Sequence, residues 1–386
     1  MKMKIKLLTL TLVCCFTLCC GCQSVLIPED KPIVLDQNSW LSGEPQNDME
    51  ILAYDDIGTG TVQDIAYDGS TLLILNPTQT APVNYNIDLL RYTDEENRLT
   101  SFLSSEKKQL AAAFDPYAKG IFYVEETVSD KAQISRQLVW TTMDKSTTKT
   151  ISAMDENVNP AFCVISDSQV LYTNGSRNIV FANANGSRQV YTTTYNLDIH
   201  AIVYLPHSGD VLYTAQSPSD ENKTNLYRSR VKDGKSTLTS TLVDENVLDL
   251  DLDTESGMLF YIKLNGGSRE IMRYNTANYG EPTAVAQGNF TSVTAVHGGE
   301  KILYSQYSST NSKSSRSIWI MDSNGKNPLQ LSAPLTLTSK IVAHPFKSTI
   351  YFSAEKTPAE MMTPDKEGNT GSSSVSTVFK IDYNIK

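Results

Sequence analysis

Cysteine is nearly absent from the body of this 386-residue chain. Five of its six cysteines lie within the first 22 residues, and only Cys163 follows. A disulfide framework beyond the N-terminal region is therefore excluded. Cys163 lies in the apolar run 161–165, and no basic partner of the kind that activates a catalytic thiolate is evident near it. We interpret Cys163 as a buried core thiol.

Sequence motifs for common enzyme classes are also missing. The chain contains no G-x-S-x-G, no H-E-x-x-H, no phosphate-binding P-loop and no G-x-G-x-x-G. Positive charge is scarce as well, because the net charge is −10 and becomes −13 without the three lysines that precede residue 7. An excess of acidic groups repels polyanions, so we expect no nucleic-acid partner.

Long hydrophobic runs are limited to the N-terminus. Three lysines (Lys2, Lys4 and Lys6) precede the apolar residues 7–20, which have the length of a signal peptide and are too short for a comfortable membrane span. The end of this run, LCCGC at 18–22, resembles a bacterial lipobox, in which a small residue precedes the cysteine that becomes lipidated. Gly21-Cys22 fits this pattern, Cys20 remains an alternative, and an ordinary cleaved signal peptide is a second one.

This resemblance implies a division of the chain into three parts. Residues 1–21 are predicted to be a lipoprotein signal peptide, residues 22–48 a lipidated Cys22 followed by a tether, and residues 49–386 a folded domain. It also implies anchoring through lipid on the extracytoplasmic face of a bacterial cell membrane.

A short pattern recurs through the folded domain. An apolar pair, usually followed by an aromatic residue, comes after a turn in seven segments: LLIL at 72–75, IFYV at 121–124, VLYT at 170–173, VLYT at 211–214, LFYI at 259–262, ILYS at 302–305 and IYFS at 350–353. The spacing is 41–49 residues, an apolar strand precedes each copy, and no stretch has a sustained helical period. Such spacing is typical of four-stranded propeller blades.

We therefore predict an all-β, seven-bladed β-propeller, with six or eight blades or a pair of β-sandwiches as alternatives. The seventh repeat provides only three of the four strands of a blade, the last near 382–386. MEILAYDD at 49–56 is a spare strand before the first blade. We expect this N-terminal strand to close the ring, because a closed ring leaves no open sheet edge.

The outer hairpin of the sixth blade carries a family resemblance. Its sequence, IWIMDSNGKNPLQLS at 318–332, resembles the repeat of TolB-type, WD40-like propellers, which reads approximately I-Y-x-M-D-x-D-G-x-x-x-x-x-L-T. The Asn324-Gly325 pair predicts a type I′ turn, which needs positive φ at both residues. Other blades depart from the family, which favours S-P-D-G before the second strand; this chain has Asp115-Pro116, Pro345-Phe346 and PHSG at 206–209 there.

Two polar patterns in the sequence, one of histidines and one of aspartates, are candidates for metal sites. His207, His297 and His344 precede the second strands of three blades, and some seven-bladed polysaccharide lyases hold a divalent metal with histidines in the channel. Turn positions in separate blades rarely converge on one metal, so surface histidines are the simpler interpretation. LDLDLDTESG at 248–257 lacks the Gly and Glu of a calcium-binding EF-hand loop and reads better as a strand that places Asp249 and Asp251 near the channel.

An acidic channel mouth is the most specific site that the sequence predicts. The tetrapeptide DENV occurs at 155–158 and at 244–247, in both cases where one blade leads into the next. The repeat register places seven carboxylates on or just before innermost strands: Asp64, Asp155, Glu156, Asp198, Asp244, Glu245 and Asp249. We expect them to select a cationic ligand or weakly bound calcium, with solvated loop charge as the alternative. No other metal or cofactor is expected.

These patterns lead to two hypotheses about function. The first is a membrane-anchored binding module that recognises a protein or cell-envelope partner and catalyses nothing. The second is a carbohydrate-active enzyme, a polysaccharide lyase or glycosidase, with its site in the channel. A glycosidase needs two carboxylates about 5–9.5 Å apart in a pocket, which is a property that only a structure reveals.

Overall fold

The computed structural model describes fifteen stretches of the chain: 33–34, 49–78, 82–92, 97–116, 119–129, 131–153, 156–166, 168–175, 177–193, 201–231, 236–278, 280–307, 315–332, 334–355 and 376–385. The chain divides into two units, Met1–Pro32 and Ile33–Lys386, and all described residues lie in the second. These residues form strands and turns, with no helix among them. The described part of the chain therefore offers no helix that is long and apolar enough to cross a membrane.

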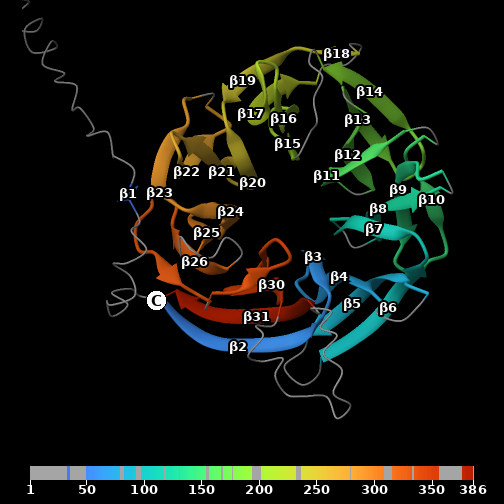
Figure 1. Ribbon diagram of the computed structural model, residues 1–386, viewed down its shortest axis with the longest axis horizontal. Coiled ribbons are helices and arrows are strands. Elements are labelled where there is room, and N and C mark those ends of the chain that lie inside the picture. Colours follow the sequence, from blue (N-terminus) through green and yellow to red (C-terminus); the bar gives the residue numbers. More distant parts are fainter. Residues whose placement is uncertain are drawn as a thin grey trace, which may run out of the picture. The chain divides into compact units, whose positions relative to one another are not determined.

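Seven sheets follow one another around a ring (Figure 1), which confirms the seven-bladed β-propeller. The first blade contains β3 (Thr61–Ile65), β4 (Thr71–Pro77), β5 (Tyr85–Tyr92) and β6 (Asn97–Ser105). The second contains β7 (Lys108–Phe114), β8 (Gly120–Val128), β9 (Ile134–Thr142) and β10 (Thr148–Thr150). The third contains β11 (Val158–Ser166), β12 (Gln169–Asn174), β13 (Asn178–Asn183) and β14 (Arg188–Thr193).

The remaining blades repeat this order of strands. The fourth contains β15 (Ile202–Leu205), β16 (Asp210–Ser217), β17 (Asp220–Arg230) and β19 (Ser240–Asp244). The fifth contains β20 (Val247–Asp253), β21 (Met258–Asn265), β22 (Ser268–Asn275) and β23 (Thr283–Gly288). The sixth contains β24 (Phe290–Val296), β25 (Lys301–Tyr307), β26 (Arg316–Asp322) and β27 (Leu329–Gln330).

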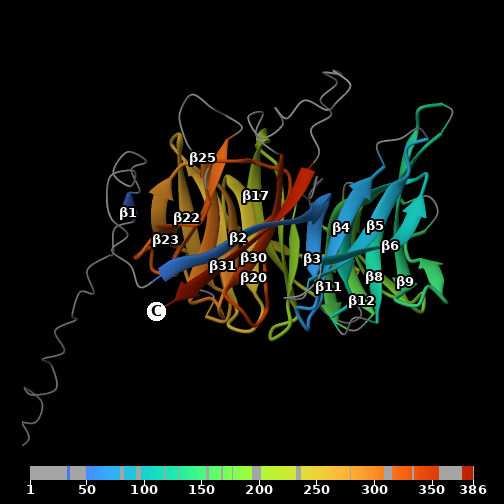
Figure 2. The same cartoon turned by 90° about the horizontal axis from the view of Figure 1, so that it is seen from below.

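The N-terminal strand closes the seventh blade, as the sequence predicts. This blade contains β28 (Thr336–Leu337), β29 (Val342–Ala343), β30 (Thr349–Glu355), β31 (Ser376–Ile385) and β2 (Met49–Thr59). Strand β2 pairs antiparallel with β31, from Met49 opposite Ile385 to Thr59 opposite Thr377. Figure 2 shows these two strands side by side along the closing blade. The two ends of the folded domain are thereby held in one sheet.

Two short strands that the sequence does not predict add a fifth member to a blade. Strand β1 (Ile33–Val34), within the predicted tether, pairs parallel with β23 of the fifth blade. Strand β18 (Thr237–Leu238), from the connection between β17 and β19, pairs parallel with β14 of the third blade. Each covers part of an outer sheet edge whose backbone groups lack another strand.

The core consists of seven hydrophobic clusters, one at each junction between consecutive blades. The recurring aromatic residues of the second strands lie in these clusters and are at most 4% exposed: Tyr123, Tyr172, Tyr213, Tyr261, Tyr304 and Phe352. Burial of such side chains contributes about 1.5–3 kcal/mol each. Each copy of the sequence repeat therefore provides the aromatic side chain that packs at one junction between blades.

The hairpin turn of the sixth blade differs from the predicted type I′ turn. Gly325 has a positive φ of 83°, but Asn324 does not belong to the described residues with positive φ. Asp322 N–H donates to the Lys326 carbonyl at 2.9 Å, so three residues form the loop. In a three-residue loop only the last position needs the left-handed conformation, and glycine supplies it. The prediction of a hairpin was right and the prediction of its turn type was wrong.

Candidate functional site

A central channel runs between the innermost strands of the blades. Two adjoining cavities, of about 630 and 300 Å³, are lined by residues of β3, β7, β11, β15, β20, β24 and the segment 340–343. They share Gln63, Asp64, Leu250, Asp251 and Lys340. All seven blades therefore contribute to this wall.

The two sides of the channel differ in chemistry. Toward the second, third and fourth blades the wall consists mainly of small apolar residues, among them Ala111, Ala161 and Ala201. The charged wall residues are three aspartates, Asp64, Asp249 and Asp251, together with Lys340, and they come from the first, fifth and seventh blades. Charge is thus concentrated on one side of the ring.

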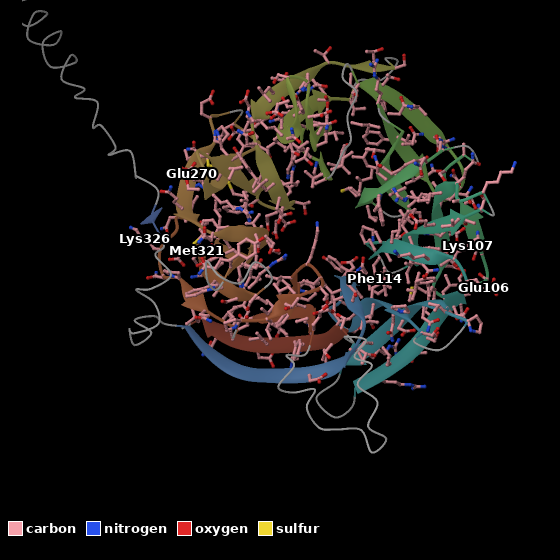
Figure 3. All side chains as sticks on the ribbon, in the orientation of Figure 1. Glu106, Lys107, Phe114, Glu270, Met321 and Lys326 are labelled. Atoms are coloured by element: carbon pink, nitrogen blue, oxygen red, sulfur yellow. The ribbon has the colours of Figure 1, made fainter. Side chains whose placement is uncertain are left out.

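Asp64 joins the first blade to the second. Its Oδ2 accepts a 2.8 Å hydrogen bond from the backbone N–H of Phe114, and its Oδ1 accepts one of 2.8 Å from its neighbour Ile65. Figure 3 shows Phe114 near the inner rim, beside the start of the first blade. Burial raises the pKa of Asp64 to about 6, although both hydrogen bonds act in the opposite direction.

Asp249 and Asp251 join the fifth blade to the sixth. They alternate along β20, so both side chains project to one face, and they accept hydrogen bonds from the backbone N–H groups of Val293 (2.9 Å) and Ala295 (2.8 Å). Burial raises the pKa of both carboxyls, that of Asp251 to about 7, while the positive charge of Lys340 partly offsets the effect. Asp251 was placed near the channel by the sequence but was not among the predicted site residues.

Lys340 is the channel residue that sequence reasoning missed. Its ammonium group influences Asp249 and Asp251 through space, yet no ion pair joins it to a carboxylate of the described residues. The available signal was its position directly before the apolar inner segment of the seventh blade. A lysine there adds positive charge to a wall predicted to be purely acidic.

The two DENV segments have a different role from the channel aspartates. Glu156 forms an ion pair with Arg188 and accepts a 3.0 Å hydrogen bond from the Tyr172 hydroxyl. Asp244 pairs with Lys263 at 2.5 Å and accepts a 2.7 Å hydrogen bond from the Tyr261 hydroxyl. Both tyrosines are the recurring aromatics of second strands, so these acids satisfy buried hydroxyl groups at blade junctions.

Five of the seven predicted mouth residues are described by the structure, and two of these five line the channel cavities. Asp64 and Asp249 do, whereas Glu156, Asp244 and the exposed Glu245 do not. Asp155 and Asp198 lie outside the described residues, as do Cys22 and His200. Across the described stretches, no group of three or more His, Cys, Asp or Glu residues is close enough together to hold a metal ion.

Two of the described histidines, His297 and His344, make separate local contacts, and the third, His207, is exposed. His297 Nε2 lies 2.9 Å from the Tyr383 hydroxyl, which joins the sixth blade to the seventh. His344 Nδ1 accepts hydrogen bonds from the backbone N–H groups of Phe346 and Lys347 within its own turn. Burial lowers the pKa of both imidazoles, which favours the neutral form.

Cys163 lies on the channel wall, where burial raises the pKa of its thiol to about 11. At neutral pH the thiol is therefore protonated and a poor nucleophile.

Comparison with solved structures places this fold among β-propellers. An oligogalacturonate lyase in complex with manganese matches with a TM-score of 0.61 and 10% identity, covering 88% of this chain and 99% of that one. A prolyl endopeptidase matches with a TM-score of 0.52 and 13% identity, covering 78% of this chain and 46% of that one. TolB from Acinetobacter baumannii matches with a TM-score of 0.45 and 17% identity, covering 65% of this chain and 59% of that one.

The likeness is one of fold. The seven blades and the match to the lyase show a β-propeller fold. No family model matches the sequence, and no curated protein matches it either. The chain spans about half of the matched endopeptidase and 59% of the matched TolB.

The channel wall does not suit the manganese held by the lyase. Manganese prefers several oxygen ligands in octahedral geometry. Among the described residues the wall aspartates do not form a group that could hold a metal ion, and Lys340 adds a positive charge beside Asp249 and Asp251. No histidine belongs to the described wall of the two cavities.

Proposed function

We propose that this chain is a membrane-anchored, extracytoplasmic propeller that binds a protein partner of the cell envelope and has no catalytic activity. One observation carries the proposal. All three carboxylates of the described channel wall accept hydrogen bonds from the neighbouring blade, so each of them has a structural role in joining two blades. The lipobox-like Gly21-Cys22 supports the anchor.

An exposed aromatic pair supports binding of a protein. Tyr67 and Phe346 are 65% and 67% exposed, the highest values among the large apolar side chains of the described residues. Their rings meet edge to face with centroids 5.9 Å apart, at the seam between the first and seventh blades. Exposed aromatic residues are enriched among the side chains that dominate protein–protein binding energy.

Crosslinking in intact cell envelopes tests this proposal. We expect Tyr67→Ala combined with Phe346→Ala to abolish capture of one specific partner without lowering the melting temperature. Val128 and Ile134 provide the matched control, because they are 60% and 52% exposed and lie opposite each other on one hairpin. Replacing these two with alanine should leave capture intact. Equal capture by both double variants would contradict a role for the aromatic pair.

The anchor needs its own test by fractionation. Cys22→Ala should release the mature protein from membranes in the absence of detergent. Release by Cys20→Ala alone would move the lipidation site to Cys20, and retention by both variants would refute the anchor.

A carbohydrate-active enzyme is the second candidate. The extended match to an oligogalacturonate lyase and the raised pKa values of Asp64 and Asp251 favour it. Incubation with oligogalacturonate, with and without manganese, would decide the matter if products are separated by chromatography. Cleavage that disappears in Asp251→Asn would establish an enzyme, and the absence of any cleavage would support the binding module.

A further inference from the structure

A second cavity lies away from the channel, between the second and third blades. Its volume is about 390 Å³, within the usual range for ligand pockets. Trp140, Thr147 and Lys149 form its wall on the second blade, and Gln169, Asn183 and Asn185 contribute from the third. It shares no lining residue with either channel cavity. We call it the 2–3 cleft.

Trp140 gives the 2–3 cleft an aromatic surface. The side chain packs against the third blade in the cluster that contains Val170 and Tyr172, and the residue is only 8% exposed. Its indole Nε1 has no hydrogen-bond partner. The indole N–H can only donate, and a buried donor without an acceptor is unfavourable. The Nε1 atom is buried and packs close to Gly120 of its own blade, so a ligand in the cleft would meet the indole ring and not its N–H group.

Lys149 places a positive charge on the same face. It lies directly opposite Trp140 in the antiparallel pair of β9 and β10. Opposite residues in such a pair project to one side of the sheet, and Trp140 shows that this side faces the third blade. Within the described stretches Lys149 forms no ion pair. Its ammonium group is therefore available at the cleft.

Among the residues that the structure describes, no carboxylate lines the 2–3 cleft, although the chain has 43 acidic residues. Asp115 lies behind the wall, where it is fully buried and accepts hydrogen bonds from the N–H and hydroxyl of Ser168. The other wall residues are neutral and polar or small. The negative charge of the whole chain acts weakly here, because salt screens charges beyond about 8–10 Å.

We propose that the 2–3 cleft binds a small anionic ligand rich in hydroxyl groups, whose carboxylate or phosphate pairs with Lys149. The neutral polar wall then forms hydrogen bonds with the hydroxyl groups of the ligand, and the face of Trp140 packs against the apolar surface of the ligand. This site is independent of the proposed function, because neither the aromatic pair Tyr67–Phe346 nor the channel takes part in it.

Indole NMR signals of the full chain provide the test. With ¹⁵N-labelled tryptophan, sodium glucuronate or glycerol 1-phosphate should shift the Trp140 Nε1–H resonance, which Trp140→Phe identifies by its loss. Trp319 is an internal control, because it is a buried tryptophan of the sixth blade and does not line the 2–3 cleft. A response to one anion and not the other would identify the ligand as a carboxylate or a phosphate. Glucose, which lacks charge, should leave both signals in place.

Substitution of the lysine separates binding from nonspecific effects. Lys149→Gln should weaken the binding of the active anion about tenfold, which corresponds to the loss of one charge-assisted hydrogen bond. Lys326→Gln is the matched control on the outer side of the sixth blade (Figure 3) and should bind like the parent. The proposal would be overturned if neither anion shifted the Trp140 signal. An equal shift with glucose would overturn it too, as would an unchanged affinity in Lys149→Gln.

Discussion

The carboxylate of Asp251 accepts a 2.8 Å hydrogen bond from the backbone N–H of Ala295, 44 residues later in the chain. This bond joins the innermost strand of the fifth blade to that of the sixth. Asp249 and Val293 repeat the arrangement two residues earlier, and Asp64 and Phe114 form its counterpart between the first two blades. Neighbouring innermost strands belong to different sheets and, within the described residues, form no backbone hydrogen bonds with each other. The aspartate side chains therefore accept hydrogen bonds from backbone N–H groups on the channel-facing edge.

Stability should depend on pH through these carboxyls. Burial raises the folded-state pKa of Asp251 to about 7 and of Asp64 to about 6, against 3.8 ordinarily. Between pH 3.8 and these values the folded state binds protons that the unfolded state has released. The free energy of unfolding should therefore fall as pH rises through this window, by at most about 1.4 kcal/mol per pH unit for each group.

Urea denaturation from pH 4.5 to 8 measures this dependence. Asp251→Asn should reduce the slope, because the amide oxygen can still accept from Ala295 while the titrating proton is lost. Asp220→Asn, at a partly exposed position of β17, is the control and should retain the decline. A parent protein that gains stability steadily from pH 4.5 to 7 would contradict the raised pKa values.

A buried ion pair should contribute strongly to the junction of the fourth and fifth blades. Arg228 Nε donates to Asp210 at 2.6 Å, and its Nη1 donates at 3.0 Å to the Thr276 carbonyl of the next blade. The two charged side chains are 7% and 1% exposed. Arg228→Met should lower the free energy of unfolding by about 3–5 kcal/mol, because the buried Asp210 loses its buried partner and the Thr276 carbonyl loses a donor.

Arg230 supplies the matched control for this pair. It also contacts Asp210, at 2.9 Å, but its side chain is 51% exposed. Arg230→Met should cost at most about 1 kcal/mol. Chemical denaturation of both variants gives the comparison, and equal losses would show that burial does not govern the strength of these contacts.

Closure of the ring should depend on the packing of β2 as well as on its hydrogen bonds. Ile57 is 5% exposed and packs with Tyr351 and Val378 of its own blade and with Val62 of the first. Ile57→Ala should reduce stability by about 2–5 kcal/mol through lost contacts and a cavity. Leu99→Ala, at a 42% exposed site on β6, should have a small effect. Thermal melts that are unchanged in Ile57→Ala would mean that β2 contributes little to closure.

Calcium tests the hypothesis of an acidic mouth. Arg188 and Lys263 already neutralise Glu156 and Asp244, so we expect millimolar calcium to leave the melting temperature unchanged. A ligand that binds the folded state would instead raise it by mass action. A calcium-dependent increase that Asp155→Asn combined with Asp244→Asn abolishes would restore the mouth as a cation site. Magnesium at the same concentration controls for ionic strength.

The blades themselves were predictable because their signals are local. Each aromatic second strand, such as VLYT at 170–173, is a short and mainly apolar run bounded by turn residues. Counting strands then left the seventh blade one short, and the only unassigned strand was the one now seen as β2. Closure followed from the need to pair an open edge, a requirement that does not depend on side-chain geometry.

The roles of the acidic residues were decided only by the tertiary structure. Sequence register placed Glu156 and Asp244 beside Asp64 and Asp249 in one mouth, because all precede or begin innermost strands. The partners of these residues lie 16 to 50 positions away: the Tyr172 and Tyr261 hydroxyls for the first two, and the Phe114 and Val293 backbone N–H groups for the others. Periodicity determines which face a side chain takes, but whether a carboxylate meets a ligand or a buried donor depends on how neighbouring blades pack, and that packing is set by contacts distant in sequence.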